Sequence, residues 1–344
     1  MSNKEVLSIF TDFVPEIESE IKKLIDDRPH LLMYDMMRYF FGFLNEDLTP
    51  AKMYGGKRYR PGLCMMLAQM YGKCDMAIEA AAAIEIFHNF TLIHDDIEDN
   101  DEIRRGRPTV WKLWGLNHGI NSGDGQNILV NIELAKLAKK EPVLGAEVLA
   151  FLSDCFLQVV EGQFLDFTLT DLSMDDEFVT RENYMEMITK KTSVLVAAAT
   201  KVAGIVSGVS DDEKEKLWQY GLNLGLAFQM QDDWNSIWAN DEETGKRKSG
   251  DIYEQKKTLP VLYAYEELEG DKKDRLVSLY KKNGGLDDQE VKEVIELLNG
   301  IGAKEYFEKV IVDYGNSAKD VVESLSVSDE SKETLKEVVK ALIK

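Results

Sequence analysis

The chain has 344 residues, of which 44% are hydrophobic, 30% charged and 9% aromatic, a composition typical of a globular protein. Its 62 Asp and Glu residues outnumber its 41 Lys and Arg residues, and the net charge of −21 argues against nucleic acid or an anionic membrane as the main partner. A small phosphorylated ligand is compatible with this charge, because a local cluster of cations can reverse the sign of the field around it.

The spacing of apolar residues predicts the fold class. Long segments between the seven prolines carry apolar residues three and four positions apart, as at Leu217, Tyr220, Leu224 and Ala227. No segment alternates with period two for long enough to indicate a strand. We therefore predict an all-α protein of about a dozen helices. No linker or repeat divides it, which favours a single domain over residues 1–344, with packing helices over about 266–344.

The cysteines and the N-terminal segment indicate a reducing compartment. Cys64, Cys74 and Cys155 lack the spacing of metal ligands, and the first residues are charged throughout, unlike a secretory signal. No run of about 18 apolar residues occurs. We expect a cytoplasmic protein without a membrane span.

The first motif in chain order, GGKRYRP at residues 55–61, is basic. Gly55 and Gly56 allow an unusual turn, and Lys57, Arg58 and Arg60 begin the next segment. A helix N-terminus that carries Arg and Lys binds anions. An ordinary basic loop is the alternative interpretation.

The second motif combines acids and arginines within residues 87–109. Asp95, Asp96 and Asp99 form a DDxxD pattern, whose carboxylates share one face of a helix and repel one another. Mg²⁺ relieves such repulsion, because it binds one or two carboxylates together with phosphate oxygens. Arg104 and Arg105 follow, and their forked guanidinium groups suit a diphosphate. A solvated acidic face is the alternative.

Three later segments repeat this chemistry. Residues 188–195 place Lys190, Lys191 and Thr192 inside an apolar helix, where snorkelling lysines are the alternative. Residues 225–238 place Asp232 and Asp233 one turn after Gln229. This second aspartate helix could face the first and bracket a metal cluster. Residues 245–260 carry Lys246, Lys256 and Lys257 and form either a cationic lid or a solvated loop.

Three polar residues admit a structural interpretation as well. His88 precedes the first aspartates on an apolar helix, where a hydrogen-bonded core histidine is the usual explanation. Gln163 and Asp166 lie in the segment EGQFLD. A structural role for them is slightly favoured over a role in supporting a binding site.

Taken in order, the motifs resemble the trans-isoprenyl diphosphate synthases, the polyprenyl synthetase family, over about residues 35–265. GGKRYRP resembles the family's GGKRxRP, and HNFTLIHDDIED with RRGRPT resembles its first aspartate-rich motif. Further matches are Gly123–Asp124, EGQFLD, KKT, FQMQDD and DIYEQKKTLP. The resemblance implies an isoprenoid-synthase-type helical bundle around a central cavity, usually a homodimer. It also implies a Mg²⁺-dependent condensation of isopentenyl diphosphate with allylic diphosphates by ionisation, head-to-tail coupling and proton loss.

The resemblance also implies a role for each matching residue. The metal ligands, for about three Mg²⁺ ions with Mn²⁺ as a substitute, are Asp95, Asp96, Asp99, Asp232 and Asp233. Cations for the allylic diphosphate are Arg104, Lys191, Lys246 and Lys256. Isopentenyl diphosphate is assigned to Gly56, Lys57, Arg60, His88 and Arg105. Thr192 and Gln229 are expected to face the developing carbocation.

Product length is expected to depend on the helix that ends in the first aspartates. Phe90 lies five residues before Asp95, with Thr91 beside it and Phe87 almost one turn deeper. One helical turn of ~5.4 Å matches the length of one extended isoprene unit. A large side chain at Phe90 therefore predicts a short product, geranylgeranyl diphosphate, with farnesyl diphosphate as the alternative.

One departure from the family pattern supports a different enzyme. Ser236 stands where many members have a third Asp, and Asn240 and Asp241 follow, faintly resembling the metal triad of class I terpene cyclases. A cyclase-like or irregular-coupling enzyme on the same fold is therefore the first alternative. The second is a non-catalytic regulatory subunit of a heteromeric synthase, although such subunits commonly lose the aspartates that this chain keeps.

Overall fold

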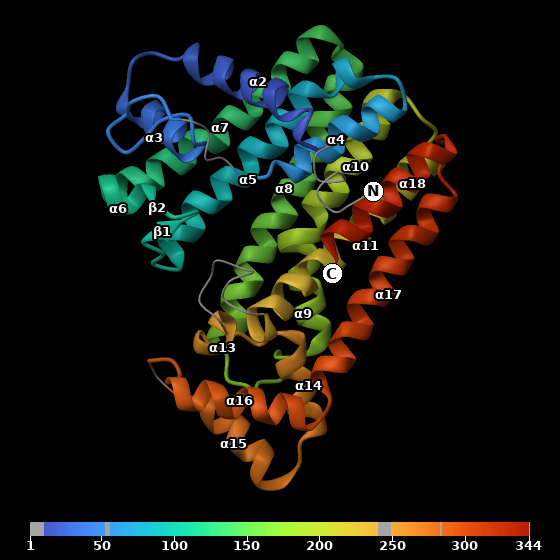
Figure 1. Cartoon of the computed structure of the whole chain (residues 1–344). Coiled ribbons are helices and arrows are strands. Elements are labelled where there is room, and N and C mark those ends of the chain that lie inside the picture. Colours follow the sequence, from blue (N-terminus) through green and yellow to red (C-terminus); the bar gives the residue numbers. More distant parts are fainter. Residues whose placement is uncertain (1–9, 52–55, 240–248, 283, 344) are drawn as a thin grey trace. The chain divides into compact units, whose positions relative to one another are not determined.

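The regular structure is almost entirely helical. The computed structural model describes residues 10–51, 56–239, 249–282 and 284–343, and Figure 1 traces the chain through them. Within these ranges the only two strands, β1 (Ile103–Arg104) and β2 (Arg107–Pro108), form one antiparallel hairpin. The prediction of an all-α protein is confirmed.

The chain forms two compact units that interleave along the sequence. The first contains residues 1–154, 198–217 and 326–331, and the second contains residues 155–197, 218–325 and 332–344. Because α8, α10, α11 and α18 contribute residues to both units, the chain passes between the units within single helices. The single domain over residues 1–344 stays a prediction.

The first unit contains the N-terminal helices and the hairpin. Its complete elements are α2 (Val14–Asp26), α3 (Leu32–Phe40), α4 (Tyr59–Met70), the 3₁₀ turn η1 (Cys74–Met76), α5 (Ile78–Glu98), β1, β2, α6 (Val110–Trp114) and α7 (Leu116–Lys140). It also receives parts of α8 (Pro142–Asp171), α10 (Val194–Ser207), α11 (Asp211–Trp238) and α18 (Asp329–Leu342).

The second unit contains the remaining parts of those four helices and the shorter C-terminal ones. Its complete elements are α9 (Arg181–Ile188), the π-helical turn η2 (Thr189–Ser193), α13 (Gly250–Tyr253), α14 (Leu259–Glu267), α15 (Gly270–Tyr280), α16 (Asp288–Gly300) and α17 (Ala303–Glu323).

Close packing of α5 against α7 organises the first unit. Ala80, Ala81, Ala82 and Ala83 are fully buried at the start of α5. Further along, a Cβ atom added to Gly123 of α7 would lie 2.3 Å from Nε2 of His94. The glycine therefore leaves room for the His94 ring against α7, near the end of α5 where the first aspartates lie.

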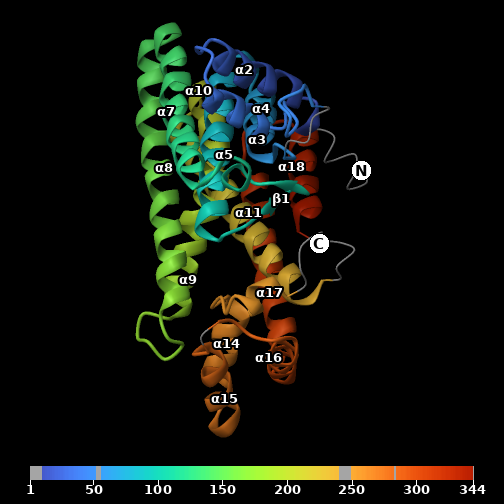
Figure 2. The ribbon, with the colours of Figure 1, turned by 90° about the vertical axis from the view of Figure 1, so that its left-hand side faces the viewer.

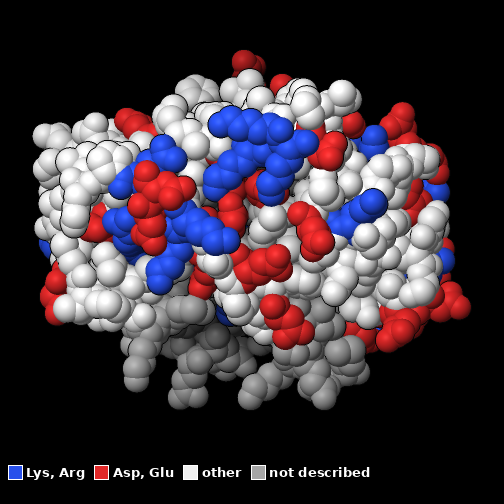
Figure 3. Space-filling model, turned by 90° about the horizontal axis from the view of Figure 1, so that it is seen from above, with Lys and Arg blue, Asp and Glu red and all other residues white. Residues whose placement is uncertain are grey.

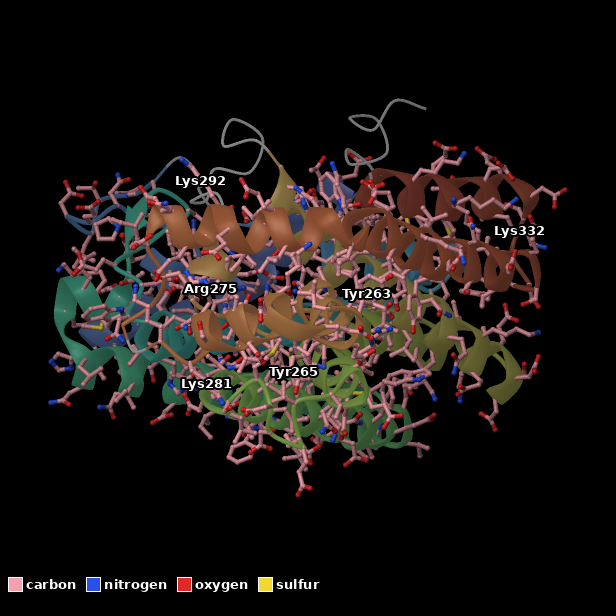
Figure 4. All side chains as sticks on the ribbon, turned by 90° about the horizontal axis from the view of Figure 1, so that it is seen from below. Tyr263, Tyr265, Arg275, Lys281, Lys292 and Lys332 are labelled. Atoms are coloured by element: carbon pink, nitrogen blue, oxygen red, sulfur yellow. The ribbon has the colours of Figure 1, made fainter. Side chains whose placement is uncertain are left out.

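The core of the second unit joins helices that are far apart in the sequence. Tyr184, Met230, Leu262 and Phe307 are buried in one cluster contributed by α9, α11, α14 and α17. At its edge the ring of Tyr263, labelled in Figure 4, stacks on Tyr306 with 4.2 Å between centroids. These contacts hold α14 to α17.

Helix α8 has an unusually apolar surface. It is long and apolar enough to cross a membrane by length and composition, although the core helix of a soluble protein passes the same test. The absence of a membrane span therefore stays a prediction. The side chains of Val143, Leu157, Val160 and Phe164 are exposed along it. Figure 2 shows the beginning of α8 running beside α7, where Gly145 packs against Ala138.

Candidate functional site

The predicted anion-binding residues converge in the first unit. A Cβ atom on Gly56 would lie 2.7 Å from Nη2 of Arg105, so this glycine makes room for the guanidinium group. Arg60 Nη1 lies 3.1 Å from His88 Nε2. Lys57 is exposed, and its Nζ lies 5.5 Å from the ring centroid of Tyr59. Figure 3 shows that Lys and Arg side chains also gather into groups, bordered by Asp and Glu, on the face seen from above.

The charges around His88 favour an anionic ligand. Burial, and then the charges of Arg60 and Arg105, lower the pKa of His88 well below its ordinary value. The neutral ring can then accept a hydrogen bond from Arg60. Burial, and then the charge of Arg58, lower the pKa of Arg105 to about 10. An anion bound here would offset this mutual repulsion of cations.

The first aspartates lie at the C-terminal end of α5. That end carries a partial negative charge, so acidic side chains there are unfavourable without a cation. Asp96 is buried and forms an ion pair with Arg104, while its Oδ2 atom has no hydrogen-bond partner. Burial raises the pKa of Asp96 to about 6, although Arg104 opposes the shift.

These carboxylates fit a hard divalent cation. Oxygen ligands suit Mg²⁺, which completes its coordination with water and phosphate oxygens, and the buried Oδ2 of Asp96 has unused acceptor capacity. Among the described residues no three His, Cys, Asp or Glu side chains form a preassembled metal site. The ligand set Asp95, Asp96 and Asp99 stays a prediction.

In the second unit two of the predicted site residues, Lys191 and Thr192, lie on a π turn. η2 (Thr189–Ser193) follows α9 directly, and such turns often occur at functional sites. A Cβ atom on Gly162 of α8 would lie 2.2 Å from the backbone nitrogen of Lys191, and one on Gly225 of α11 would lie 2.6 Å from Ser193 Cα. Two glycines therefore let the flanking helices touch the turn.

Side chains on this turn connect to both flanking helices. Lys191 Nζ donates a hydrogen bond of 2.5 Å to Asp166 on α8. Thr192 Oγ1 donates to Gln229 Oε1 at 2.7 Å, and Gln229 Nε2 donates to Asp233 Oδ1 at 2.8 Å. Thr192, Gln229 and Asp233 thus form one chain of hydrogen bonds, which places three predicted residues together.

Asp232 and Asp233 have different surroundings. Asp232 is exposed, whereas Asp233 is buried and also accepts a hydrogen bond of 2.5 Å from the hydroxyl of Tyr184. Burial, and then the charge of Asp251, raise the pKa of Asp233 to about 8. Asp232 is therefore the carboxylate better presented to a metal ion. That the two aspartate helices face each other across a cavity stays a prediction.

Sequence reasoning missed Tyr184 and Asp251. The sequence offers no signal for Tyr184, because its partner Asp233 is 49 residues away. Asp251 did have a signal, since it opens the matching segment DIYEQKKTLP. Its carboxylate lies 4.0 Å from Lys256 Nζ. Lys257 instead donates to the carbonyl of Thr170 at the end of α8. Lys246 lies outside the described residues.

The proposed length-determining residues lie inside α5. Phe90 is buried, with its ring centroid 5.5 Å from that of Phe87 and 4.9 Å from that of His94. Thr91 is partly buried, and its hydroxyl donates to the carbonyl of His88. Phe90 is thus a buried aromatic side chain five residues before Asp95, and its role as the floor stays a prediction.

Three comparisons connect this chain to known proteins. The polyprenyl synthetase family model matches residues 44–298. A short chain isoprenyl diphosphate synthase of Methanothermobacter thermautotrophicus is 39% identical over 328 residues, covering 94% of each chain. A geranylgeranyl diphosphate synthase of Methanosarcina mazei is 36% identical over 285 residues, covering 81% of this chain and 84% of that one. The crystal structure of geranylgeranyl pyrophosphate synthetase from Pyrococcus horikoshii superposes with a TM-score of 0.86 at 30% identity, covering 100% and 99% of the two chains.

Proposed function

The chain belongs to the polyprenyl synthetase family and is a short-chain trans-prenyltransferase, and from that membership we propose that it makes geranylgeranyl diphosphate. The substrates are isopentenyl diphosphate and an allylic diphosphate. The relatives named above support the short-chain type. The assignment of product length rests on one observation, the buried ring of Phe90 five residues before Asp95.

Isopentenyl diphosphate binds to the cations of the first unit. The contact of Arg60 with His88 and the seat of Arg105 against Gly56 support this assignment, together with the exposed Lys57. Forked guanidinium groups hold diphosphate oxygens in pairs. A neutral His88 keeps Arg60 oriented without adding a further positive charge.

The allylic diphosphate binds to the aspartates and cations that the family motifs assign to it. Asp95, Asp96, Asp99, Asp232 and Asp233 hold Mg²⁺, with Mn²⁺ as a substitute. When bound, these ions supply the charge neutralisation that makes diphosphate a leaving group. Arg104, Lys191, Lys246 and Lys256 hold the same diphosphate. In the free enzyme Arg104 pairs with Asp96, and Lys191 pairs with Asp166. When the allylic diphosphate binds, each cation exchanges its carboxylate partner for the diphosphate.

Thr192 and Gln229 face the developing carbocation. Their hydrogen bond uses the Thr192 hydroxyl as donor and Gln229 Oε1 as acceptor. The lone pairs of the Thr192 oxygen remain able to stabilise a positive charge, since a hydroxyl has two acceptor sites. No side chain is required as a nucleophile, because the double bond of isopentenyl diphosphate attacks the cation.

The enzyme is a homodimer in the cytoplasm. The exposed apolar side chains of Leu157, Val160 and Phe164 on α8 lie on one helical face, as a subunit interface would place them. The described cysteines are free thiols, which suits a reducing compartment.

Ser236 does not favour the cyclase alternative. Its hydroxyl accepts a hydrogen bond from the backbone nitrogen of Asp251 at 3.2 Å, and its carbonyl accepts one from Ser249 at 2.7 Å. Both bonds join α11 to the segment that precedes Lys256. Ser236 therefore has a structural use that requires no metal.

The test is to incubate the enzyme with isopentenyl diphosphate, Mg²⁺ and each allylic primer in turn, and to size the products by chromatography. We expect a geranylgeranyl product. A farnesyl product would correct the length assignment alone. Hydrocarbon made from geranylgeranyl diphosphate, without consumption of isopentenyl diphosphate, would establish the cyclase instead. Inactivity without a second subunit would favour the regulatory alternative.

A further inference from the structure

Arg58 behaves differently from its neighbours in the basic motif. Lys57 is exposed and Arg60 partly buried, whereas the side chain of Arg58 is 0% exposed. Its φ angle is +53°, a left-handed conformation that is uncommon for residues other than glycine. The backbone here is therefore turned so that Arg58 points into the protein, and it cannot itself contact a ligand at the surface.

The guanidinium group of Arg58 connects three other elements. Nη1 lies 2.6 Å from Glu85 on α5, and Nη2 lies 3.3 Å from Glu18 on α2. Nη2 also donates a hydrogen bond of 2.9 Å to the carbonyl of Phe41, directly after α3. Two buried carboxylates and a carbonyl thus fix one side chain, and with it the start of α4.

Glu85 connects this anchor to the anion-binding residues. It lies three residues, or about one helical turn, before His88, which contacts Arg60. Asn89 also donates a hydrogen bond of 2.6 Å to Glu85. Burial lowers the pKa of Arg60, and the charge of Glu85 opposes that shift. The same carboxylate therefore holds Arg58 and helps to keep Arg60 charged.

We propose that Arg58 is a positioning residue that holds the backbone from Gly56 to Arg60, so that Lys57 and Arg60 are aimed at the diphosphate of isopentenyl diphosphate. This inference rests on the proposed function. Without the anchor the left-handed turn at Arg58 would relax, and the residues on either side of it would lose their orientation. Arg58 thus acts through Lys57 and Arg60 and touches no substrate.

Arg38 provides a matched control in the same unit. Its guanidinium group contacts Asp26 at 2.9 Å and Asp35 at 2.8 Å, and it donates to the carbonyl of Ile25 at 3.2 Å. The set of two carboxylates and one carbonyl is the same as for Arg58. None of these three partners belongs to the candidate site. Arg38→Met therefore measures the general effect of losing an arginine anchor, separate from any effect on the candidate site.

The experiment compares Arg58→Met, Arg58→Lys and Arg38→Met by steady-state kinetics, with melting temperature as the check on folding. Because misplaced binding groups cost about 10- to 100-fold, we expect Arg58→Met to raise KM for isopentenyl diphosphate by about that factor. KM for the allylic substrate should change little. Arg58→Lys, which keeps the charge but not the fork, should give a smaller increase. Arg38→Met should leave both KM values unchanged.

Arg60→Ala and a double variant separate a failure of this inference from a failure of the proposed function on which it rests. If Arg60→Ala leaves KM for isopentenyl diphosphate unchanged, the binding site itself is misassigned. If Arg60→Ala raises that KM but Arg58→Lys and Arg58→Met do not, the positioning role is overturned. We expect the increase in Arg58→Met/Arg60→Ala to be smaller than the product of the two single increases, because both changes remove the same contact. Should Arg58→Met fail to fold, Arg58→Lys supplies the same comparison.

Discussion

Burial gives neighbouring aspartates different properties. Both oxygens of Asp233 accept hydrogen bonds, from Tyr184 and Gln229, and the carboxylate is shielded from water. Asp232, the next residue, is exposed. Asp232 can therefore exchange water for a metal ion directly, whereas Asp233 would bind the metal ion with oxygens that already accept hydrogen bonds from Tyr184 and Gln229.

Removal of metal should abolish the reaction. The acids at the end of α5 repel one another and the helix terminus, and without a cation they cannot help a diphosphate leave. Chelator should therefore stop turnover, and added Mg²⁺ should restore it. Asp95→Ala and Asp232→Ala should each raise the barrier by ~3 kcal/mol or more, measured as kcat. Full turnover by metal-stripped enzyme in excess EDTA would refute this mechanism.

Phe90 provides the sharpest test of product length. Phe90→Ala opens a void beside Phe87, and a growing tail gains ~0.8 kcal/mol for each methylene that it buries there. We expect products longer by about one isoprene unit, with metal dependence unchanged. Stability should fall by ~3–5 kcal/mol. Chromatography of the products beside those of the parent decides the matter, since an unchanged distribution in an active variant would make Phe90 ordinary core.

Among the helices, the π turn and the two glycines beside it act together. η2 presents Lys191 and Thr192 to different neighbours, and it does so while α8 and α11 touch its backbone. A straight α-helix through Thr189–Ser193 would change the direction of both side chains. The orientation of these two residues therefore depends on helices outside their own segment.

Gly162→Ala tests this dependence. The new methyl group would meet the backbone nitrogen of Lys191, which cannot move aside as a side chain can. We expect a stability loss of ~1–3 kcal/mol and a clear fall in kcat, measured by denaturation and kinetics. Gly300→Ala is the control, because no atom lies within 4 Å of its added Cβ. Equal effects of the two substitutions would mean that the contact with η2 has no special role.

Helical periodicity was enough to predict the fold class, whereas the roles that motif order assigns to the charged residues stay predictions. The motifs assigned Gly56, Arg60, His88 and Arg105 to one ligand, and the structure adds the contacts of Arg60 with His88 and of Gly56 with Arg105. Local sequence could not reveal the inward turn of Arg58, because its partners Glu18 and Glu85 lie 40 and 27 residues away. The same reason explains why Tyr184 was missed. The π turn was also missed, and the glycines that let α8 and α11 touch it, Gly162 and Gly225, belong to other helices.

At the scale of the whole molecule, the exposed apolar face of α8 should control assembly. Phe164 is 72% exposed and Leu157 is 58% exposed, so a charge at either site does not disturb the interior. We expect Leu157→Glu/Phe164→Glu to convert a dimer into monomers in sedimentation experiments, with helix content unchanged. Val312→Glu on α17, 52% exposed, is the control. A double variant that sediments like the parent would exclude this face as the interface.

The interleaving of the two units has a consequence for synthesis on the ribosome. The first unit includes residues 326–331, where Ser326 donates its backbone N–H to Glu213, which also accepts a hydrogen bond from Tyr71. Ribosomes add about 5–20 residues per second, and domains usually fold as they emerge. Here the hydrogen bond from Ser326 to Glu213 cannot form until residue 326, which lies 113 residues after Glu213, has left the exit tunnel. The first unit therefore completes its contacts only after most of the second unit, residues 155–197 and 218–325, has been made.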